Sequence, residues 1–335
     1  FPTWMWRNAE VEAFIRWLRG YNDGRPSEAM AGFYGLDLYN LSGSIRPVID
    51  YLDDVDPDAA RLARERYGCL MPWSRDPALY GRLAITEGYA RCEEDVVRML
   101  GDLQRKRLDY AARDGEEWLD AAANARLVAN AEQYYRVMYH GAAESWNLRD
   151  THMFETLCQL LEAKGPDSKS VVWAHNSHIG NAAFTEMGQV RDELNLGQLV
   201  KERFGGEARL VGLGTHRGTV AAAADWDAEM EIKDVRPSLP GSYERLSHDT
   251  GQPRFLLDLR DGELDSDLRE ELMEARLERF IGVVYRPDSE RWSHYAQAIL
   301  PMQFGAWVWF DETAAVTPLA TEAREGEDET WPFGL

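Results

Sequence analysis

The sequence predicts an α/β protein with a mainly parallel sheet flanked by helices, joined to a helical lobe. Two observations support this class. Between about residues 82 and 165 the chain is rich in Ala, Leu, Arg and Glu, which favour helices. From residue 166 onward, short β-branched and aromatic runs alternate with helical patterns. We therefore expect a single domain, with the helical lobe at about 82–165 and the α/β part at about 1–81 and 166–335.

The N-terminal stretch predicts two helices with a strand between them. "NAEVEAFIRWLRGYN" has apolar residues at helical spacing, and Asn8 is a suitable N-cap. "GFYGLDLYNL", at 32–41, is aromatic and alternating, which predicts a strand. "SGSIRPVIDYLDDV" then predicts a helix in spite of Pro47.

Three long helices are predicted for the helical lobe. The first two span roughly 83–112 and 116–139. The third begins near "WNLRDTHMFETLCQLLEAKG", with Asn147 as a possible cap and Gly165 as the stop.

A βαβ unit is predicted next. "SKSVVWAH" and "EARLVGLGTH" have the composition of strands, and "RDELNLGQLVKERFG" between them is an amphipathic helix. Such a unit normally makes a parallel pair with a right-handed crossover. A further helix is predicted at "REELMEARLERF", and further strands at 254–260, 279–287 and 306–312.

Charge and cysteine content exclude several classes of protein. The chain has 58 acidic and 37 basic side chains, a net charge of −21, which repels nucleic acid and anionic membrane surfaces. No apolar run is long enough to cross a bilayer. The cysteines, Cys69, Cys92 and Cys158, are scattered and form no CxxC pair, so we expect neither a disulfide framework nor a thiolate zinc site. These features predict a cytoplasmic globular protein that binds neither nucleic acid nor a membrane; the sequence does not predict its oligomeric state.

Histidines follow two predicted strands of this unit. His175 and His178 come after the first strand and His216 after the second. Ligands bind outside the carboxyl ends of the strands in open α/β sheets, and a neutral imidazole suits general acid–base chemistry. The alternative is that these imidazoles only satisfy loop carbonyls.

Other chemistries have less support. HxxH supplies two zinc ligands and Glu186 is a possible third, but HExxH is absent, so we expect no metal and no other cofactor. The GxSxG nucleophile elbow is absent too. "GLGTHRG" does not match the GxGxxG spacing of dinucleotide sites. Arg149 and Asp150, in "ESWNLRDTHM", are either a structural ion pair or groups that bind substrate or orient a histidine.

Several long motifs, in order, resemble the erythromycin esterase family: "FPTWMWRN", "FYGLDLYNLSGSI", "SWNLRDTHM", "VVWAHNSHIGNA", "VGLGTHRGTVAAAADWD", "MEIKDVRPSLPGSYE" and "WPFGL". The resemblance covers nearly the whole chain. Named members of that family open macrolide lactones with histidine-activated water, without a covalent serine intermediate, and many relatives have no established substrate. The resemblance therefore implies a hydrolase with its active cleft between a sheet and a helical lobe. His175 and His178 correspond to the family's HxxH, and Arg149 and Asp150 fall in its "WNxRDxxM" stretch.

One family motif is missing. The GExxH expected before "FPTWMW" does not occur in the 335 residues, and the chain does not begin with Met. We therefore expect a sequence that lacks the family's N-terminal catalytic segment, with reduced activity and exposed apolar surface that promotes self-association.

The sequence thus predicts a hydrolase of a carboxylic ester or macrocyclic lactone, with His175 and His178 as catalytic residues. Asn176, Arg149, Asp150, Glu186 and His216 are expected to bind substrate or support that pair. Two alternatives stay open. One is a non-catalytic binding protein of the same fold, and the other is a metal-dependent hydrolase that uses HxxH plus a carboxylate.

Overall fold

The helix predicted after Asn8 is present as α1 (Ala9–Asn22) in the computed structural model of the chain. The Asn8 side chain accepts a hydrogen bond from the backbone N–H of Val11 at 2.8 Å, so Asn8 is the N-cap as expected. The strand predicted at 32–41 is wrong, because residues 31–39 have no regular secondary structure. Alternation of apolar residues marks a face for burial, but it does not provide a neighbouring strand. The structure describes residues 3–39, 41–73, 77–87, 91–106, 115–138, 142–226 and 228–320.

The described chain divides into two units, one helical and one containing the sheets. The helical unit spans residues 36–170, and the other unit combines residues 3–35 with 171–320. Helices of the first unit are α2 (Leu41–Val55), α3 (Pro57–Tyr67), α4 (Pro77–Glu87), α5 (Arg91–Arg105), α7 (Gly115–Val137) and α8 (Ala142–Lys164). Residues 36–81, which the sequence assigned to the α/β part, thus group with the helices.

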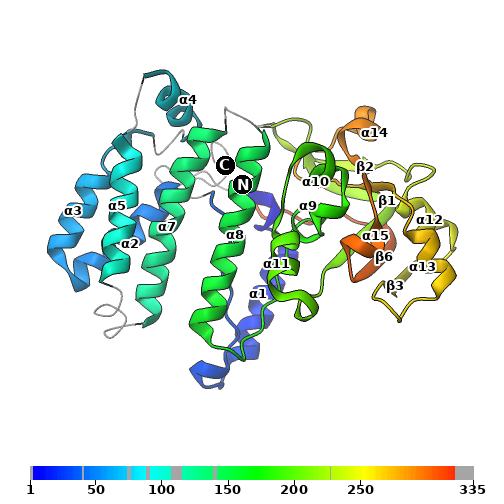
Figure 1. Cartoon of the computed structure of the whole chain (residues 1–335), viewed down its shortest axis with the longest axis horizontal. Coiled ribbons are helices and arrows are strands. Elements are labelled where there is room, and N and C mark those ends of the chain that lie inside the picture. The colour runs from blue at the N-terminus through cyan, green and yellow to red at the C-terminus, as the bar shows by residue number, and fades with distance from the viewer. Residues whose placement is uncertain are drawn as a thin grey trace. The chain divides into compact units, whose positions relative to one another are not determined.

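Helix α7 is the centre of the helical unit and packs against α2, α4, α5 and α8 (Figure 1). Buried apolar side chains from these helices, such as Leu52, Val96 and Val128, form one core. Pro47 lies inside α2, as expected. The tract predicted as one helix over 83–112 is instead divided between α4 and α5, and its last residues lie outside the described ranges.

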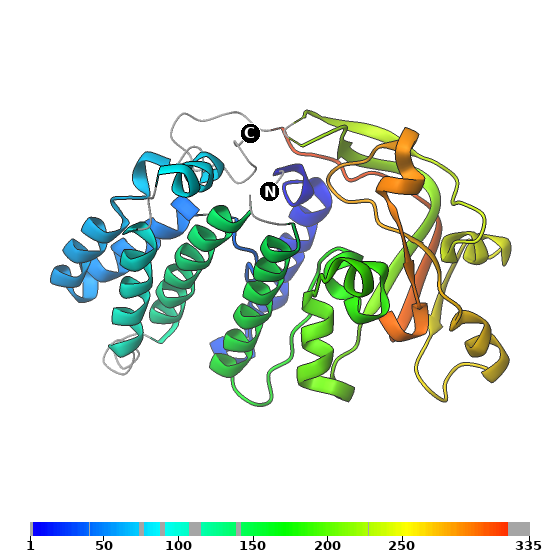
Figure 2. The same ribbon diagram turned by 45° about the horizontal axis from the view of Figure 1, so that its top comes forward.

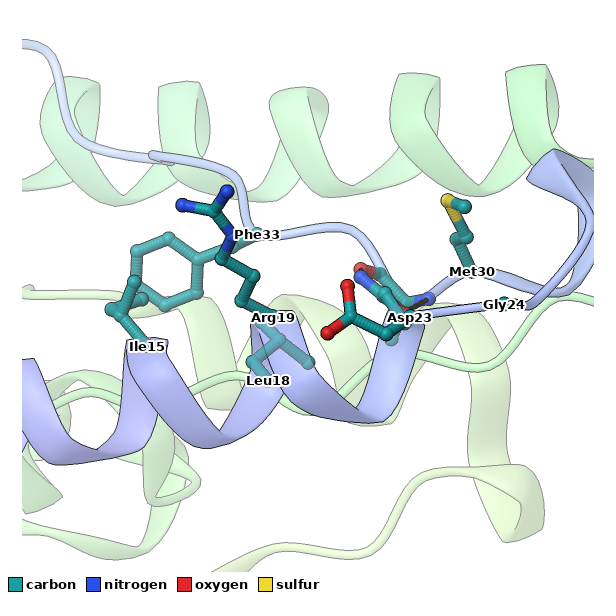
Figure 3. A pocket seen from close by; sticks show the side chains of 9 residues that line it. Ile15, Leu18, Arg19, Asp23, Gly24, Met30 and Phe33 are labelled. Carbon is teal, nitrogen blue, oxygen red and sulfur yellow. Dashed lines mark hydrogen bonds between the residues drawn. The ribbon is translucent and has the colours of Figure 1, made fainter.

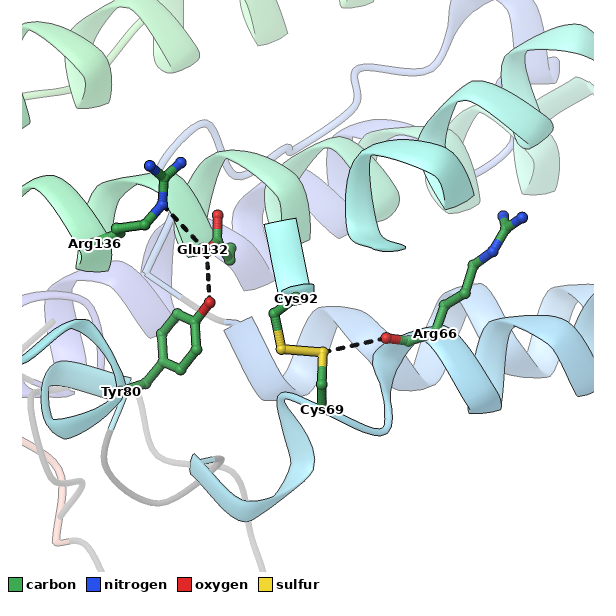
Figure 4. Close-up of a disulfide and its surroundings, with 6 residues drawn as sticks. All are labelled: Arg66, Cys69, Tyr80, Cys92, Glu132 and Arg136. Atoms are coloured by element: carbon green, nitrogen blue, oxygen red, sulfur yellow. Dashed lines mark hydrogen bonds and ion pairs between the residues drawn. A yellow bond between two sulfur atoms is a disulfide. The ribbon is translucent and has the colours of Figure 1, made fainter. Parts of the chain in front are cut away.

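A disulfide joins Cys69 and Cys92 in this unit, which corrects the expectation of unpaired cysteines (Figure 4). Cys69 follows α3 and Cys92 lies in the first turn of α5, and their Cα atoms are 5.8 Å apart. The packing of α3 against α5 brings the two together. A spacing of 23 residues carries no signal for that pairing. Cys158, on α8, remains a thiol.

The second unit contains a four-stranded sheet in the order β2-β1-β6-β3. Strands β1 (Val211–Ala223) and β6 (Ala306–Thr313) are parallel, whereas β2 (Met230–Val235) and β3 (Arg254–Asp258) pair antiparallel with β1 and β6 respectively. The α/β class is confirmed, and the sheet is mixed.

A two-stranded sheet and several short helices complete this unit. The small sheet pairs β4 (Arg276–Arg279) with β5 (Tyr295–Ala298). Figure 2 shows α9 to α11 on one side of the strands and α12 and α13 on the other. The helices are α9 (Asn176–Ile179), α10 (Glu186–Arg191), α11 (Leu196–Phe204), α12 (Tyr243–Asp249), α13 (Ser266–Leu272), α14 (Glu290–Ser293) and α15 (Leu300–Gln303).

Two predicted strands differ in the structure. Residues 168–175 lead into α9 without joining a sheet, so the predicted βαβ unit lacks its first strand. The strand predicted at 279–287 lies earlier in the chain, as β4, and the helix predicted at 269–280 is only α13. In both cases composition predicted extended chain, but pairing depends on residues far away in sequence.

The glycines of "GLGTHRG" make room for aromatic rings. A Cβ atom on Gly212 would lie 2.6 Å from the ring of Phe304, and one on Gly214 would lie 2.1 Å from the ring of Trp307. These glycines therefore allow large side chains to pack directly on β1, which explains them without a phosphate ligand.

Candidate functional site

The candidate site is the turn from His175 to Gly180, which contains both histidines of the HxxH pattern. His175 is the N-cap of α9, and its Nδ1 accepts a hydrogen bond from the backbone N–H of Ser177 at 3.3 Å. The turn ends at Gly180, whose N–H donates to the carbonyl of Asn176 at 2.9 Å. His175 and His178 are thus on one short helical turn.

Asn176 attaches this turn to strand β1. Its Nδ2 donates to the carbonyl of Leu213 at 2.8 Å, and its Oδ1 accepts from the N–H of Leu213 at 3.2 Å. The side-chain amide therefore pairs with both backbone groups of Leu213, as a neighbouring strand would. Asn176 is 8% exposed, which suits a group that orients the turn.

His175 uses both imidazole nitrogens inside the fold. Nε2 lies 2.9 Å from the carbonyl oxygen of Ile281, so Nε2 carries the proton and donates. Nδ1 lies 2.9 Å from Oγ of Ser177 and accepts. Burial, with a smaller contribution from the neighbouring His178, lowers the pKa of His175 to about 4. His175 is therefore neutral at pH 7, with a fixed tautomer.

The other half of the turn is held by Asn195, the N-cap of α11. Asn195 Nδ2 donates to the carbonyl of Ser177 at 2.7 Å, while its Oδ1 accepts from the N–H of Gln198 at 2.9 Å. His178 is 8% exposed, and its backbone N–H donates to the carbonyl of His175. The chain on both sides of His178 is therefore anchored.

Buried carboxyl groups lie next to this turn. Asn176 Nδ2 also donates to Oε1 of Glu278 on β4, at 3.2 Å. Glu278 is fully buried, and so is Glu244 on α12, whose Oε1 accepts from the N–H of Arg279 at 2.9 Å. Burial raises the pKa of Glu278 well above its usual range, and the Glu244 carboxyl raises it further.

His216, which we expected near this turn, lies within β1 and belongs to another cluster. Strand β1 continues past His216 because it pairs with β2 from Gly218 onward. The His216 ring stacks on His248 at 3.6 Å between centroids, and its Nδ1 lies 2.7 Å from Oγ of Ser238. The prediction that His216 ends a strand beside a second strand ending in His175 is therefore wrong.

Glu186 supports the fold next to β5. It is the first residue of α10, and its Oε2 accepts a hydrogen bond from the N–H of Gln297 at 3.0 Å. Among the residues that the structure describes, no three His, Cys, Asp or Glu side chains are grouped so as to hold a metal ion.

Arg149 and Asp150 lie on α8 in the helical unit. Arg149 makes a two-pronged ion pair with Asp37, at 2.9 Å from Nε and 2.6 Å from Nη2, and its guanidinium lies 4.7 Å from the centre of the Tyr39 ring. Asp150 is fully buried. Arg149 therefore has a structural partner that the sequence did not reveal, because Asp37 is 112 residues away.

The groups that hold the turn were missed by sequence reasoning. Glu278, Ile281 and Asn195 lie in ordinary strand, loop and cap patterns, and only the fold brings them to the HxxH motif. The capping pattern "NLGQ" was a signal for Asn195 as an N-cap, but not for its contact with Ser177.

A separate pocket of about 470 Å³ lies along α1 (Figure 3). Its wall combines apolar side chains, including Ile15, Leu18 and Phe33, with Arg19 and Asp23. None of the predicted site residues lines it. In the part of the chain that the structure describes, no helix is both long and apolar enough to span a membrane.

Comparisons with known proteins agree with this fold. A family model described as erythromycin esterase matches residues 1–313. A structure described as a succinoglycan biosynthesis protein is 21% identical, with a TM-score of 0.76, and the match covers 94% of this chain and 73% of that chain. A protein from Bacillus cereus is 17% identical, with a TM-score of 0.78 and coverage of 94% and 74%. A mutant of the erythromycin esterase EreC in its open conformation is 14% identical, with a TM-score of 0.65 and coverage of 93% and 75%. Identities this low show a shared fold alone.

Proposed function

The chain belongs to the erythromycin esterase family, and from that premise we propose that it hydrolyses a carboxylic ester or a macrocyclic lactone. In the proposed reaction an imidazole removes a proton from water as the water oxygen attacks the acyl carbon. The carbon–oxygen bond then breaks, and the proton passes to the departing alkoxide. The products are a carboxylic acid and an alcohol.

The observation that carries this proposal is the anchored turn that holds His175 and His178. A general base needs a neutral imidazole in a fixed orientation, and hydrogen bonds from several elements fix this turn. We propose His178, on the same anchored turn, for the proton transfer. We propose that His175 orients the turn, since both of its nitrogens are hydrogen-bonded within the fold. Both histidines are those that the sequence predicted for the site, but we propose proton transfer for His178 alone.

Substitution of each histidine tests the proposal. We expect His178→Ala to reduce hydrolysis of erythromycin and of p-nitrophenyl acetate by about 100-fold or more, since general acid–base groups contribute about 10²–10⁴-fold. His175→Ala is expected to lose activity as well, by misplacing the turn. Glu312→Gln, at an exposed carboxyl outside the turn, is the control and should keep wild-type rates.

Mass spectrometry measures the gain of one water molecule by the macrolide, and absorbance follows the nitrophenol. Full activity in a folded His178→Ala variant would contradict the assignment. If the wild-type protein hydrolyses neither probe, the substrate lies outside these two esters, and a wider ester and lactone panel is needed before the histidines can be compared.

A non-catalytic binding protein is the second candidate, and the bonding of His175 favours it. Both His175 nitrogens satisfy groups of the fold, as structural histidines do, and Arg149 is engaged by Asp37. Under this alternative, a macrolide binds with measurable heat in calorimetry but is recovered unchanged. Turnover by wild type that is lost in His178→Ala would exclude it.

The metal-dependent alternative has weaker support, because Glu186 already accepts a backbone hydrogen bond from β5. Its test is direct: chelation would abolish activity, and a divalent ion would restore it.

For the supporting residues, we propose that Asn176 orients the turn. Arg149, Asp150 and His216 remain proposals for substrate binding, and mutation of each would separate an effect on KM from an effect on kcat.

The net charge of −21 supports a small-molecule substrate over a nucleic acid or an anionic membrane. The cytoplasm remains our proposal for the location, although the Cys69–Cys92 disulfide removes the argument from unpaired cysteines. Thiol alkylation of protein taken directly from cells would show whether the two cysteines are reduced there. A fully formed disulfide would argue for an oxidising compartment.

A further inference from the structure

Two carboxyl groups are buried beside the HxxH turn, and each has one oxygen without a hydrogen bond. Glu278 on β4 is 0% exposed and Glu244 on α12 is 1% exposed. Oε1 of Glu278 accepts from Asn176, and Oε1 of Glu244 accepts from the N–H of Arg279. Oε2 of each has no hydrogen-bond partner among the described residues.

Two adjacent buried carboxylates are electrostatically costly, because burial and mutual repulsion both oppose ionisation. Burial raises the pKa of both groups, and each of the two has a group that opposes the shift: Arg279 for Glu244, and the side chains of Asn176 and Gln303 for Glu278. The Arg279 guanidinium is already paired with Glu290, at 3.2 Å. A retained proton is therefore the simplest way to neutralise Glu278.

From this geometry we propose that Glu278 is a positioning residue, a neutral carboxylic acid that holds the His175–His178 turn through Asn176. The inference rests on the proposed function for its catalytic meaning. As a protonated acid, Glu278 accepts from Asn176 at Oε1 and carries its proton at Oε2.

Strand β4 and the residues just after it supply two of the attachments of the turn. Glu278 binds Asn176, and Ile281, three residues later, accepts the Nε2 proton of His175. A shift of this segment would therefore move the Glu278 side chain that holds Asn176 and the Ile281 carbonyl that holds His175. Gln303 adds a close contact, because a Cβ on Gly180 would lie 2.8 Å from its Nε2.

The other ionisable groups around the carboxyl pair come from several elements. Helix α9 contributes the histidines of the turn, and α14 contributes Glu290, which is paired with Arg279. The remaining groups, on α12, β4 and β5, are Tyr243, Arg276, Arg279 and Tyr295. Burial raises the pKa of Tyr243 to about 12, so it is neutral near pH 7, and the arginines stay charged.

The direction of the pH effect follows from linkage. Above the usual carboxyl pKa of about 4.3, the unfolded chain releases the Glu278 proton while the folded chain keeps it. The folded state then binds more protons, so its stability falls as pH rises until the folded pKa is passed. An uncharged amide at this position has no such dependence.

The first test compares thermal unfolding of wild type and Glu278→Gln between pH 5 and pH 9. Gln keeps an oxygen for Asn176 and carries no charge, so it imitates the protonated acid. We expect the Tm of Glu278→Gln to rise relative to wild type as pH increases. Glu263→Gln, at an exposed carboxyl, is the matched control and should follow wild type. Parallel pH curves for wild type and Glu278→Gln would overturn the proposal.

The second test measures the tautomer of His175 directly, by long-range ¹H–¹⁵N NMR spectra of the protein labelled with ¹⁵N at its histidines. In wild type and Glu278→Gln we expect His175 as the neutral Nε2–H tautomer. Glu278→Ala should lose that signature, because the attachment of the turn through Asn176 is removed. A folded Glu278→Ala with unchanged His175 signals would show that Glu278 does not position the turn.

Neither readout needs a substrate. The two tests can therefore support or contradict the positioning role of Glu278 even if the chain does not hydrolyse an ester. Where p-nitrophenyl acetate is hydrolysed, we also expect Glu278→Ala to lower kcat/KM by about 100-fold, the scale of a 1 Å misplacement. Glu278→Gln should stay within about tenfold of wild type. Equal losses in the two variants would contradict a neutral acid at this position.

Discussion

His175 is held between Ser177, whose hydroxyl donates to Nδ1, and the carbonyl of Ile281, which accepts from Nε2. Protonation of Nδ1 would break the bond from Ser177, since a protonated imidazole has no acceptor. Burial keeps the ring neutral, and the two bonds fix its orientation. A single residue thus connects a local turn to a segment about a hundred residues later.

This arrangement predicts a loss of stability in acid. The pKa of His175 is about 4 in the folded chain, below the usual value of about 6.5. As pH falls from about 6.5 to about 4, the unfolded chain takes up a proton that the folded chain refuses, so the free energy of unfolding decreases. Between those two pKa values, lowering the pH by one unit reduces the free energy of unfolding by about 1.4 kcal/mol. Chemical denaturation of wild type and His175→Gln between pH 7 and pH 4 should show a smaller decrease in the variant. An identical decrease would contradict the assignment.

At the residue scale, the sequence predicted the histidines of the site but not their partners. HxxH after a β-rich run is a local pattern, and the structure places both histidines on one turn. Glu278 and Ile281 lie about a hundred residues away, and Asp37 lies far from Arg149. A buried glutamate in a short strand has no local signature, because charged residues normally indicate exposed positions.

At the element scale, Arg279 connects the small sheet to the large one. Its Nη2 donates to the carbonyls of Thr215 and His216 on β1, and its Nη1 contacts Glu290 on α14 at 3.2 Å. Nη1 also donates to the carbonyl of Arg236, after β2. The guanidinium therefore satisfies backbone carbonyls along an edge of β1.

Breaking this buried ion pair should destabilise the fold strongly. Arg279 and Glu290 side chains are 2% and 4% exposed, so removing either partner leaves a buried charge unpaired. We expect Arg279→Met to lower the free energy of unfolding by about 3–5 kcal/mol in urea denaturation. The control is Glu312→Gln, which breaks the exposed Arg217–Glu312 pair and should cost no more than about 1 kcal/mol. Similar effects in the two variants would mean that Arg279 is not a structural connection.

Elements that are specified locally were predicted better than elements that depend on pairing. Helix α1 follows from an N-cap and apolar spacing, and β6 from alternating aromatic residues. The segment at 168–175 has the composition of a strand, yet no ladder includes it. Pairing of Cys69 with Cys92 also depended on helix packing. Composition reports the preferred conformation of a segment, but not its neighbours.

At the scale of the whole molecule, the two faces of the large sheet differ. Trp307 and Trp309 point into the core from β6 and are almost fully buried. On the opposite face, Leu213 and Leu256 both pair with Val308, so the three form one apolar row across β1, β6 and β3. Leu213 is 52% exposed and Leu256 is 67% exposed, and Phe310, two residues along β6, is 41% exposed. An apolar row across three strands is costly to leave in water.

This apolar face predicts self-association, which follows from the energy of burial at about 25 cal/mol for each Å² of apolar surface removed from water. We expect light scattering after gel filtration to show a molecular mass that increases with protein concentration. The variant with Leu213→Thr and Leu256→Thr should shift toward the mass of a single chain, because Thr keeps the strand propensity while removing apolar surface. Ile232→Thr, at an exposed apolar residue on β2 outside that row, is the matched control. A wild-type protein that stays at the mass of one chain over the whole concentration range would contradict this prediction. An equal effect of the control would point to general surface hydrophobicity rather than to this face.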